Sequence, residues 1–274
     1  MISVDGFRGL VVHDSPAAGI EDLGGVQARF CDLDGEESGT SALSLLSPAE
    51  RDRAAKWKSE RDRKRFVARC AFVRRTLGGL VGRPAETLGF QLGRCGKPYL
   101  SGGIGRAGED GRALTFSVSH SENILGLAVA SGREVGIDLE VVRPIPDLLA
   151  IAMTHFAPES VNLLRSRPAD DRVLEFYRLW TRNEAYAKML GRGIECRHTH
   201  EPTTIARWAV RSFTLRQPGS TIVGSIAVEG LPRAGRQDRI GRECPVAVCA
   251  RRDAFPSRVA FVPPEVLATA VSPT

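Results

Sequence analysis

Several features that would narrow the function at once are missing from this sequence. No stretch approaches the roughly 20 consecutive apolar residues that a membrane-spanning helix needs. No early apolar run follows a basic start, so we expect no signal peptide, no membrane partner and a cytoplasmic protein. The six cysteines include no C-x-x-C pair, and we expect them to be reduced thiols.

One local group of metal-binding residue types does occur. Cys196, His198 and His200 alternate in the stretch CRHTH. This spacing is not a recognised zinc pattern and no second ligand pair lies nearby, so a polar loop is favoured over a metal site.

The composition that is present indicates a globular chain. Its 274 residues are 42% apolar, which suits one large domain or two small ones. The formal net charge of +6 favours an anionic partner, which leaves nucleic acid, a phosphorylated cofactor or an acidic protein open.

The order of predicted elements favours an α+β fold. The stretch SPAE has a capping serine, a proline at the first helical position and Glu50 to complete a capping box. A helix follows, with apolar residues at helical spacing from Phe66 to Leu77, and Gly78 and Gly79 are expected to end it. Strands are predicted at 114–131 and 134–142. Helices are predicted at about 147–165 and at 176–190, and further strands follow in the last third.

The stretch EVGIDLEVV carries two carboxylates on one face of a strand. Side chains two positions apart point the same way, so Asp138 and Glu140 lie opposite Ile137 and Leu139. At about 7 Å apart the two charges repel each other unless a cation relieves them, and Mg²⁺ takes such oxygen ligands. The alternative is an exposed strand whose acids face water.

Three further patterns are individually weak. Trp180, Glu184 and Lys188 follow one another at four-residue spacing and line one helical stripe, although Glu184 and Lys188 also make an ordinary helix ion pair. Ser119 and His120 in FSVSHS stand at a strand end, where they could donate to phosphate oxygens or simply form a polar turn. Lys97 in GKP means nothing alone.

Together and in this order, the motifs closely resemble those of the Sfp-type 4'-phosphopantetheinyl transferases. The family pattern reads GKP, F-x-x-S-H-S, G-I-D-I/L-E and W-[ST]-x-K-E-[AS]-x-x-K, and the chain has GKP, FSVSHS, GIDLE and WTRNEAYAK. The likeness covers roughly residues 45–265. Asn183 departs from it, because the family usually has a lysine there.

The resemblance implies a single-chain pseudo-dimer with pseudo-twofold symmetry. Each half is a small antiparallel sheet packed on a long helix, with the active site between the halves. The expected boundaries are an N-terminal subdomain at 1–133, a C-terminal subdomain at 134–263 and a tail at 264–274, in a monomer. The echo of LAVAS at 127–131 in VAVCA at 246–250 fits two similar halves.

The resemblance also implies a reaction. Such enzymes move the phosphopantetheine arm of coenzyme A to a serine of an apo acyl or peptidyl carrier protein and release 3',5'-ADP, with Mg²⁺ or Mn²⁺. By motif position, Asp138, Glu140 and Glu184 would bind the metal, Lys188 the diphosphate, and Glu184 or a water that it holds would be the base.

The remaining implied roles concern coenzyme A. Ser119 and His120 would hold diphosphate oxygens, and Lys97 would contact the phosphates or the adenine region. Arg53, and also Arg69, would bind the 3'-phosphate. The carrier would serve polyketide, non-ribosomal peptide or siderophore synthesis.

Three other readings remain open. A nucleic-acid-binding module could use the basic stretch 51–75, but it leaves the motif set unexplained. A coenzyme A-binding relative with impaired catalysis is suggested by Asn183. A Mg²⁺ nuclease could use Asp138 and Glu140, but it would need neither GKP nor SHS.

Overall fold

The fold is seen in a computed structural model that describes residues 2–4, 11–14, 23, 25–35, 40–93, 95–102, 113–191, 208–217 and 219–230. In chain order the elements are β1 (Ile2–Val4), β2 (Val11–Asp14), β3 (Gln27–Asp32), α1 (Thr40–Ser44), α2 (Pro48–Ala55), α3 (Glu60–Val81), the 3-10 turn η3 (Ala85–Thr87), β4 (Phe90–Leu92), β5 (Pro98–Leu100), β6 (Leu114–Ser121), β7 (Ile124–Ser131), β8 (Val135–Val141), α4 (Leu148–His155), α5 (Pro158–Ser166), α6 (Ala169–Met189), β9 (Trp208–Gln217) and β10 (Ser220–Glu229).

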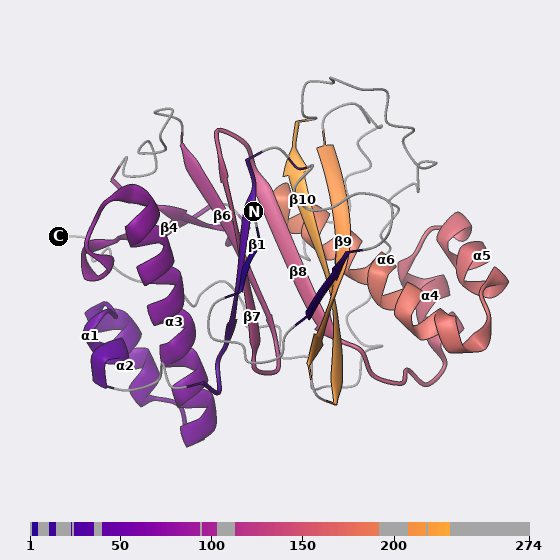
Figure 1. Ribbon diagram of the computed structural model, residues 1–274, viewed down its shortest axis with the longest axis horizontal. Helices are drawn as coiled ribbons and strands as arrows, with labels where there is room; N and C mark the ends of the chain where they lie inside the picture. The colour runs from indigo at the N-terminus through magenta and orange to yellow at the C-terminus, as the bar shows by residue number, and fades with distance from the viewer. Residues whose placement is uncertain are drawn as a thin grey trace.

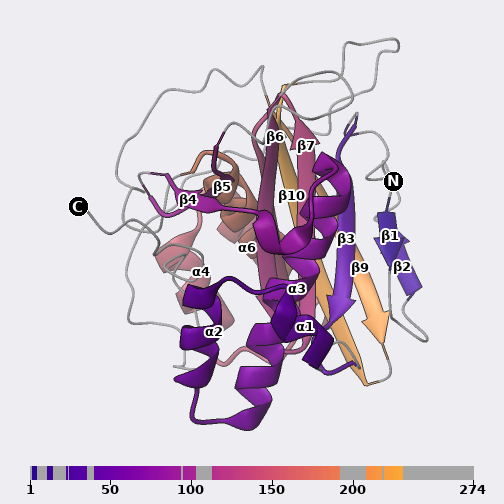
Figure 2. The same ribbon diagram turned by 90° about the vertical axis from the view of Figure 1, so that its left-hand side faces the viewer.

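Two four-stranded sheets lie face to face between two long helices. The first sheet has the strand order β1-β3-β7-β6 and the second the order β2-β9-β10-β8. Helix α3 covers the outer face of the first sheet and α6 that of the second (Figures 1 and 2). The α+β expectation is therefore confirmed.

Strand alternation builds the layer between the sheets. One side of β7 and one side of β8 face inward, so that apolar residues of both sheets form one core. Its members include Phe30, Ile124, Ala128, Val135, Ile137, Leu139, Phe213, Ile222 and Ile226. At Gly126 of β7 an added Cβ would lie 2.8 Å from Leu139, so this glycine permits the close approach of the sheets. The predicted division of β8 into an apolar and an acidic face is confirmed.

The α2–α3 region begins as the sequence predicts but ends later. Ser47 accepts from the backbone N–H of Glu50, and Glu50 accepts from that of Ser47, which is the expected capping box. The expectation that Gly78 and Gly79 end α3 is wrong, because the helix continues to Val81 and ends at Gly82 with φ 64°. Gly78 instead allows the backbone at Arg83 and Ala85 to pack directly on the helix.

A buried ion pair joins α2 to α3. Arg74 donates to the Glu50 carboxylate at 2.7 Å and to the carbonyls of Ala85 and Leu88, and both charged side chains are buried. Removal of either partner would leave a buried charge without compensation, so this pair ties the two helices to η3.

Other expectations are met in part. The helical tract at 147–165 is two helices, because the chain is extended at Phe156 and Ala157 before Pro158 starts α5. The strand β2 pairs with β9, so residues 11–14 join the second sheet although they lie within the expected N-terminal subdomain. The Cys196 group, most of the loop at 101–111, the stretch 244–252 and the tail lie outside the described residues. None of the helices in the described ranges is long and apolar enough to cross a membrane.

Candidate active site

The candidate site lies where the edge strands of the two sheets meet. Among the described strands, β6 lies at one edge of the first sheet, and β8 lies at an edge of the second sheet, where it pairs with β10. On its other side, β8 donates backbone N–H groups to serine hydroxyls of β6, from Ile137 to Ser117, from Leu139 to Ser119 and from Val141 to Ser121. The two sheets are therefore joined along this seam by side chains.

The two carboxylates of β8 turn away from the core and toward α6. Asp138 is only 5% exposed, and its Oδ2 has no hydrogen-bond partner among the residues that the structure describes. Burial, together with the nearby charges of Asp138 and Glu184, raises the pKa of Glu140 to about 8. A buried carboxylate oxygen without a partner, beside a carboxyl group that holds its proton, is an arrangement that a bound cation would relieve.

A glycine lets α6 approach these carboxylates. A Cβ at Gly136 would collide with the backbone carbonyl of Ala185 and the backbone N–H of Met189, so only glycine fits between β8 and the helix. The close approach brings Lys188 to Asp138, with its Nζ 2.7 Å from Oδ1. Lys188 also donates to the Ser119 hydroxyl at 3.0 Å.

The three residues predicted to form one stripe on α6 lie in two different environments. Lys188 reaches Asp138, and the charge of Glu184 acts on Glu140. Trp180, in contrast, packs in a separate aromatic cluster of α4, α5 and α6, stacked on Phe176 at a centroid distance of 6.1 Å and edge-on to Phe156. The tryptophan therefore anchors the helix, while the acid and the base lie toward β8.

A cationic group from α3 faces the other side of β6. Arg69 lies 3.4 Å from His120 Nε2, and because arginine can only donate, this nitrogen accepts and the imidazole proton is on Nδ1. The guanidinium groups of Arg69 and Arg53 lie 5.2 and 5.9 Å from the centre of the Phe66 ring.

Burial and neighbouring charges shift the pKa values of these groups. Burial, together with the positive charges of Arg69, Lys188 and Arg65, lowers the pKa of His120 to about 3. Burial also lowers the pKa of Arg69. Two arginines, a lysine and a neutral imidazole that can donate thus lie near one another, which suits an anion with several oxygens.

Lys97 of the GKP loop lies against the start of β8 and the end of α6. Its ammonium group is buried and donates to the Glu134 carboxylate at 2.6 Å and to the carbonyls of Val135 and Met189 at 2.8 and 3.1 Å. Because all three of its protons are used, Lys97 joins the GKP loop to the start of β8 and the end of α6.

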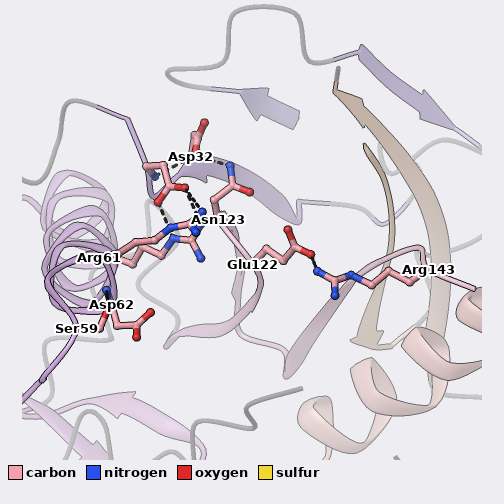
Figure 3. Close-up of polar contacts among 9 residues, drawn as sticks. Asp32, Ser59, Arg61, Asp62, Glu122, Asn123 and Arg143 are labelled. Atoms are coloured by element: carbon pink, nitrogen blue, oxygen red, sulfur yellow. Dashed lines mark hydrogen bonds and ion pairs between the residues drawn. The ribbon is translucent and has the colours of Figure 1, made fainter. Parts of the chain in front are cut away.

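The hairpin turn after FSVSHS is held on both sides (Figure 3). Asn123 donates to the Asp32 carboxylate at 2.7 Å, which fixes the turn to the end of β3. Glu122, which has a positive φ of 54°, forms an ion pair with Arg143 just after β8. The turn therefore fixes the end of β6, including His120 and Ser121, relative to β8.

The geometry brings together most of the predicted residues. Asp138, Glu140, Lys188, Ser119 and His120 meet at the seam of β6 and β8, with Arg69 and Arg53 beyond His120. Within the described residues, no group of three or more His, Cys, Asp or Glu side chains is arranged so that it could hold a metal ion. The acid pair and the cations could hold a polyanion and a divalent cation together.

Comparisons with known proteins agree with this arrangement. Residues 134–249 match the family model of the 4'-phosphopantetheinyl transferase superfamily, and residues 36–132 match that of the 4'-phosphopantetheinyl transferase N-terminal region. The 4'-phosphopantetheinyl transferase HetI of Nostoc sp. is 34% identical over 209 residues, which are 72% of this chain and 85% of the relative. The chain belongs to the 4'-phosphopantetheinyl transferase family.

Two other relatives of this transferase match over shorter stretches. A putative 4'-phosphopantetheinyl transferase of Synechocystis sp. is 32% identical over 151 residues, 55% of this chain and 59% of the relative. The 4'-phosphopantetheinyl transferase Sfp of Bacillus subtilis is 25% identical over 159 residues, 58% of this chain and 66% of the relative. The resemblance to the Sfp type is thereby confirmed, as is the expectation of an enzyme.

The sequence reasoning missed two parts of this transferase's site. Ser117 and Ser121 bond to β8 just as Ser119 does, and the signal for them was the alternation of serines in FSVSHS. The contact of Gly136 with α6 had no separate signal, because a glycine in a strand does not tell which element approaches it.

Proposed function

We propose that this transferase moves the 4'-phosphopantetheine arm of coenzyme A to a serine hydroxyl of an apo carrier protein, with a divalent cation, and releases 3',5'-ADP. The observation that carries the proposal is the Asp138–Glu140 pair on the α6 side of β8, with buried Asp138 bound by Lys188 and with Arg69 near His120 of the neighbouring strand β6. Acidic groups that could bind a cation next to cationic groups that could bind phosphates support this proposal.

Two observations on the acid pair support a magnesium ion in this proposal. Among the described residues, Asp138 Oδ2 lacks a hydrogen-bond partner, and the pKa of Glu140 is raised to about 8. A divalent cation would give the Asp138 oxygen a partner and would favour the ionised form of Glu140. Asp138 and Glu140 would hold the ion. Glu184 is the third candidate ligand, because its charge already acts on Glu140. When bound, Mg²⁺, or Mn²⁺ in its place, would neutralise charge on the phosphate oxygens.

In this proposal, different cationic side chains bind different phosphate groups of coenzyme A. Lys188 and the Nδ1–H of His120 would bind the diphosphate, and Arg69 and Arg53 the 3'-phosphate. The arrangement supports this because the arginines lie on the α3 side of β6 and Lys188 on the α6 side.

The proposed chemical step uses these groups. The carrier serine oxygen attacks the β-phosphorus, and its proton passes to Glu184 or to a water that Glu184 holds. The bond from the β-phosphorus to the bridging oxygen breaks, and 3',5'-ADP leaves with the electron pair. Lys188 stabilises the charge that develops on the diphosphate, and the fixed positions of the reactants supply much of the remaining rate.

Lys97 and Ser119 take supporting roles in the proposal. The protons of the Lys97 ammonium are all donated within the protein, and the Ser119 hydroxyl already has three partners. We therefore assign Lys97 to holding α6 against β8, in place of the expected contact with coenzyme A.

The carrier is proposed from the resemblance to the Sfp type. An acyl or peptidyl carrier of polyketide, non-ribosomal peptide or siderophore synthesis is the expected partner of a cytoplasmic monomer that binds neither nucleic acid nor membrane. The net charge of +6 would speed the encounter with an acidic carrier.

Intact-mass analysis of an apo carrier protein tests the proposal. Incubation with the transferase, coenzyme A and Mg²⁺ should add one phosphopantetheinyl group, and EDTA should prevent the addition. Asp138→Ala should abolish the transfer, whereas Asp170→Ala, at an exposed position of α6, should leave it unchanged. Full activity of Asp138→Ala in a folded protein would refute the metal assignment.

A further inference from the structure

The serines of β6 form a regular ladder against β8. Ser117, Ser119 and Ser121 alternate along the strand, so they share the face that meets β8. Each hydroxyl oxygen accepts a backbone N–H of β8, at 3.2 Å from Ile137, 3.2 Å from Leu139 and 3.0 Å from Val141.

Two of these three serines also bond to a carboxylate. Ser119 donates to Asp138 Oδ1 at 3.0 Å, and Ser121 donates to Glu140 Oε2 at 3.1 Å. In each case the acid directly precedes the residue whose N–H the same serine accepts. Ser117 accepts from Ile137, and the residue before Ile137 is Gly136, which has no side chain. Ser117 therefore makes the backbone bond without a carboxylate contact.

The hydroxyls of Ser119 and Ser121 each accept a hydrogen bond and donate another, which fixes their orientation. A serine hydroxyl has one proton and two lone pairs, so an oxygen that accepts from β8 must aim its proton elsewhere. At Ser119 the second lone pair accepts from Lys188 at 3.0 Å, which leaves the proton for Asp138. This assignment uses Oδ1 of Asp138 twice, by Ser119 and Lys188, and leaves the buried Oδ2 without a partner.

We propose that Ser119 and Ser121 are positioning residues that fix the rotamers of Asp138 and Glu140 for the divalent cation, with Ser119 also setting Lys188. This inference rests on the proposed function, since it needs the two acids to be metal ligands. It differs from the expectation that Ser119 holds the diphosphate, because it makes the serine act through the acid. Loss of a partner that orients a metal ligand typically weakens metal affinity or activity 10- to 100-fold.

The chain supplies its own control for the test. Ser117→Ala removes a backbone bond between the sheets without touching a carboxylate, while Ser119→Ala and Ser121→Ala remove the same type of bond together with the carboxylate contact. Mn²⁺ is the probe, and its binding to each folded variant is measured by electron paramagnetic resonance titration of the free ion. Circular dichroism confirms the fold, and Ser121, which is less buried than Ser119, provides the second variant if Ser119→Ala does not fold.

The expected loss of Mn²⁺ affinity differs among the three serine variants. Ser119→Ala and Ser121→Ala should weaken Mn²⁺ binding about 10-fold or more, and Ser117→Ala less than about 2-fold. Saturating metal should restore much of kcat in the first two variants, and the KM for coenzyme A should stay near the wild-type value in Ser121→Ala, whose serine does not contact Lys188. Unchanged Mn²⁺ affinity in Ser119→Ala and Ser121→Ala, an equal loss in Ser117→Ala, or a raised KM alone would overturn the inference.

Asp138→Asn distinguishes this inference from the proposed function. If it binds Mn²⁺ like the wild type, the metal assignment fails and the positioning role fails with it. If it loses Mn²⁺ while Ser119→Ala and Ser121→Ala match Ser117→Ala, only the positioning role fails.

Discussion

At the scale of single residues, His120 makes stability depend on pH. The pKa of its imidazole is about 3 in the folded chain and about 6.5 in the unfolded one, because burial and the neighbouring cations oppose its charge. Between these values the unfolded chain binds a proton that the folded chain does not. Stability should therefore fall as pH falls below about 6.5, by at most about 1.4 kcal/mol per pH unit from this residue.

His120→Gln isolates this contribution, since glutamine keeps a donor and an acceptor but does not titrate. Urea unfolding from pH 8 to pH 4.5 should give a constant difference in free energy of unfolding between wild type and variant above pH 7. Below pH 6.5 the wild type should lose stability faster than the variant. Parallel curves over the whole range would show that the folded histidine titrates normally.

The residue types of the site could be predicted from the sequence more fully than their partners. The alternation of β8 predicts that Asp138 and Glu140 share a face, and their separation from the core is confirmed. Lys97 could not be placed, because its partners at Glu134, Val135 and Met189 are up to 92 positions away along the chain. Spacing along one strand or helix carries no information on such distant contacts.

At the scale of elements, the packing of α6 on β8 depends on Gly136. Gly136→Ala would place a methyl group against the backbone of Ala185 and Met189, and backbone cannot move aside as a flexible side chain can. We expect a loss of at least about 1–3 kcal/mol of stability. Displacing Lys188 from Asp138 should also lower kcat/KM by about 10-fold or more, because small misplacements are costly in catalysis.

Gly79→Ala is the matched control for this prediction. An added Cβ at Gly79 meets no atom within 4 Å, and the position lies inside α3 with ordinary helical geometry. Alanine should stabilise the protein there by about 0.5–1 kcal/mol without changing the activity. Thermal unfolding and the carrier assay measure both effects, and a Gly136→Ala variant with wild-type stability and activity would contradict the packing.

The ends of helices and strands could be predicted from the sequence where neighbouring residues alone determine them. The capping box at Ser47 and Glu50 is a local pattern and is confirmed, as are the strands at 114–131. The end of α3 was misplaced because Gly78 is tolerated inside the helix by packing on the segment at Arg83 and Ala85, which is a tertiary contact. Local propensity cannot tell a glycine that ends a helix from one that makes room for a neighbour.

At the scale of the whole molecule, the family resemblance predicts two sheets and two long helices, but not how the sheets share strands. Residues 11–14 complete the second sheet as β2, next to β9, although they lie some 200 positions earlier. A strand of four residues has too little pattern to show which sheet it joins. The division of the chain at 133/134 remains a prediction, because the sheets exchange contacts across it.

These shared contacts predict that the two halves fold as one unit. The core between the sheets draws apolar residues from both halves, and the serines of β6 satisfy N–H groups of β8. Either half alone would expose its inner face and leave these groups to water. Calorimetry of the full chain should give one transition, with equal van't Hoff and calorimetric enthalpies, and the separate segments 1–133 and 134–274 should not fold. Two resolved transitions, or a segment with dispersed amide resonances, would show independent subdomains.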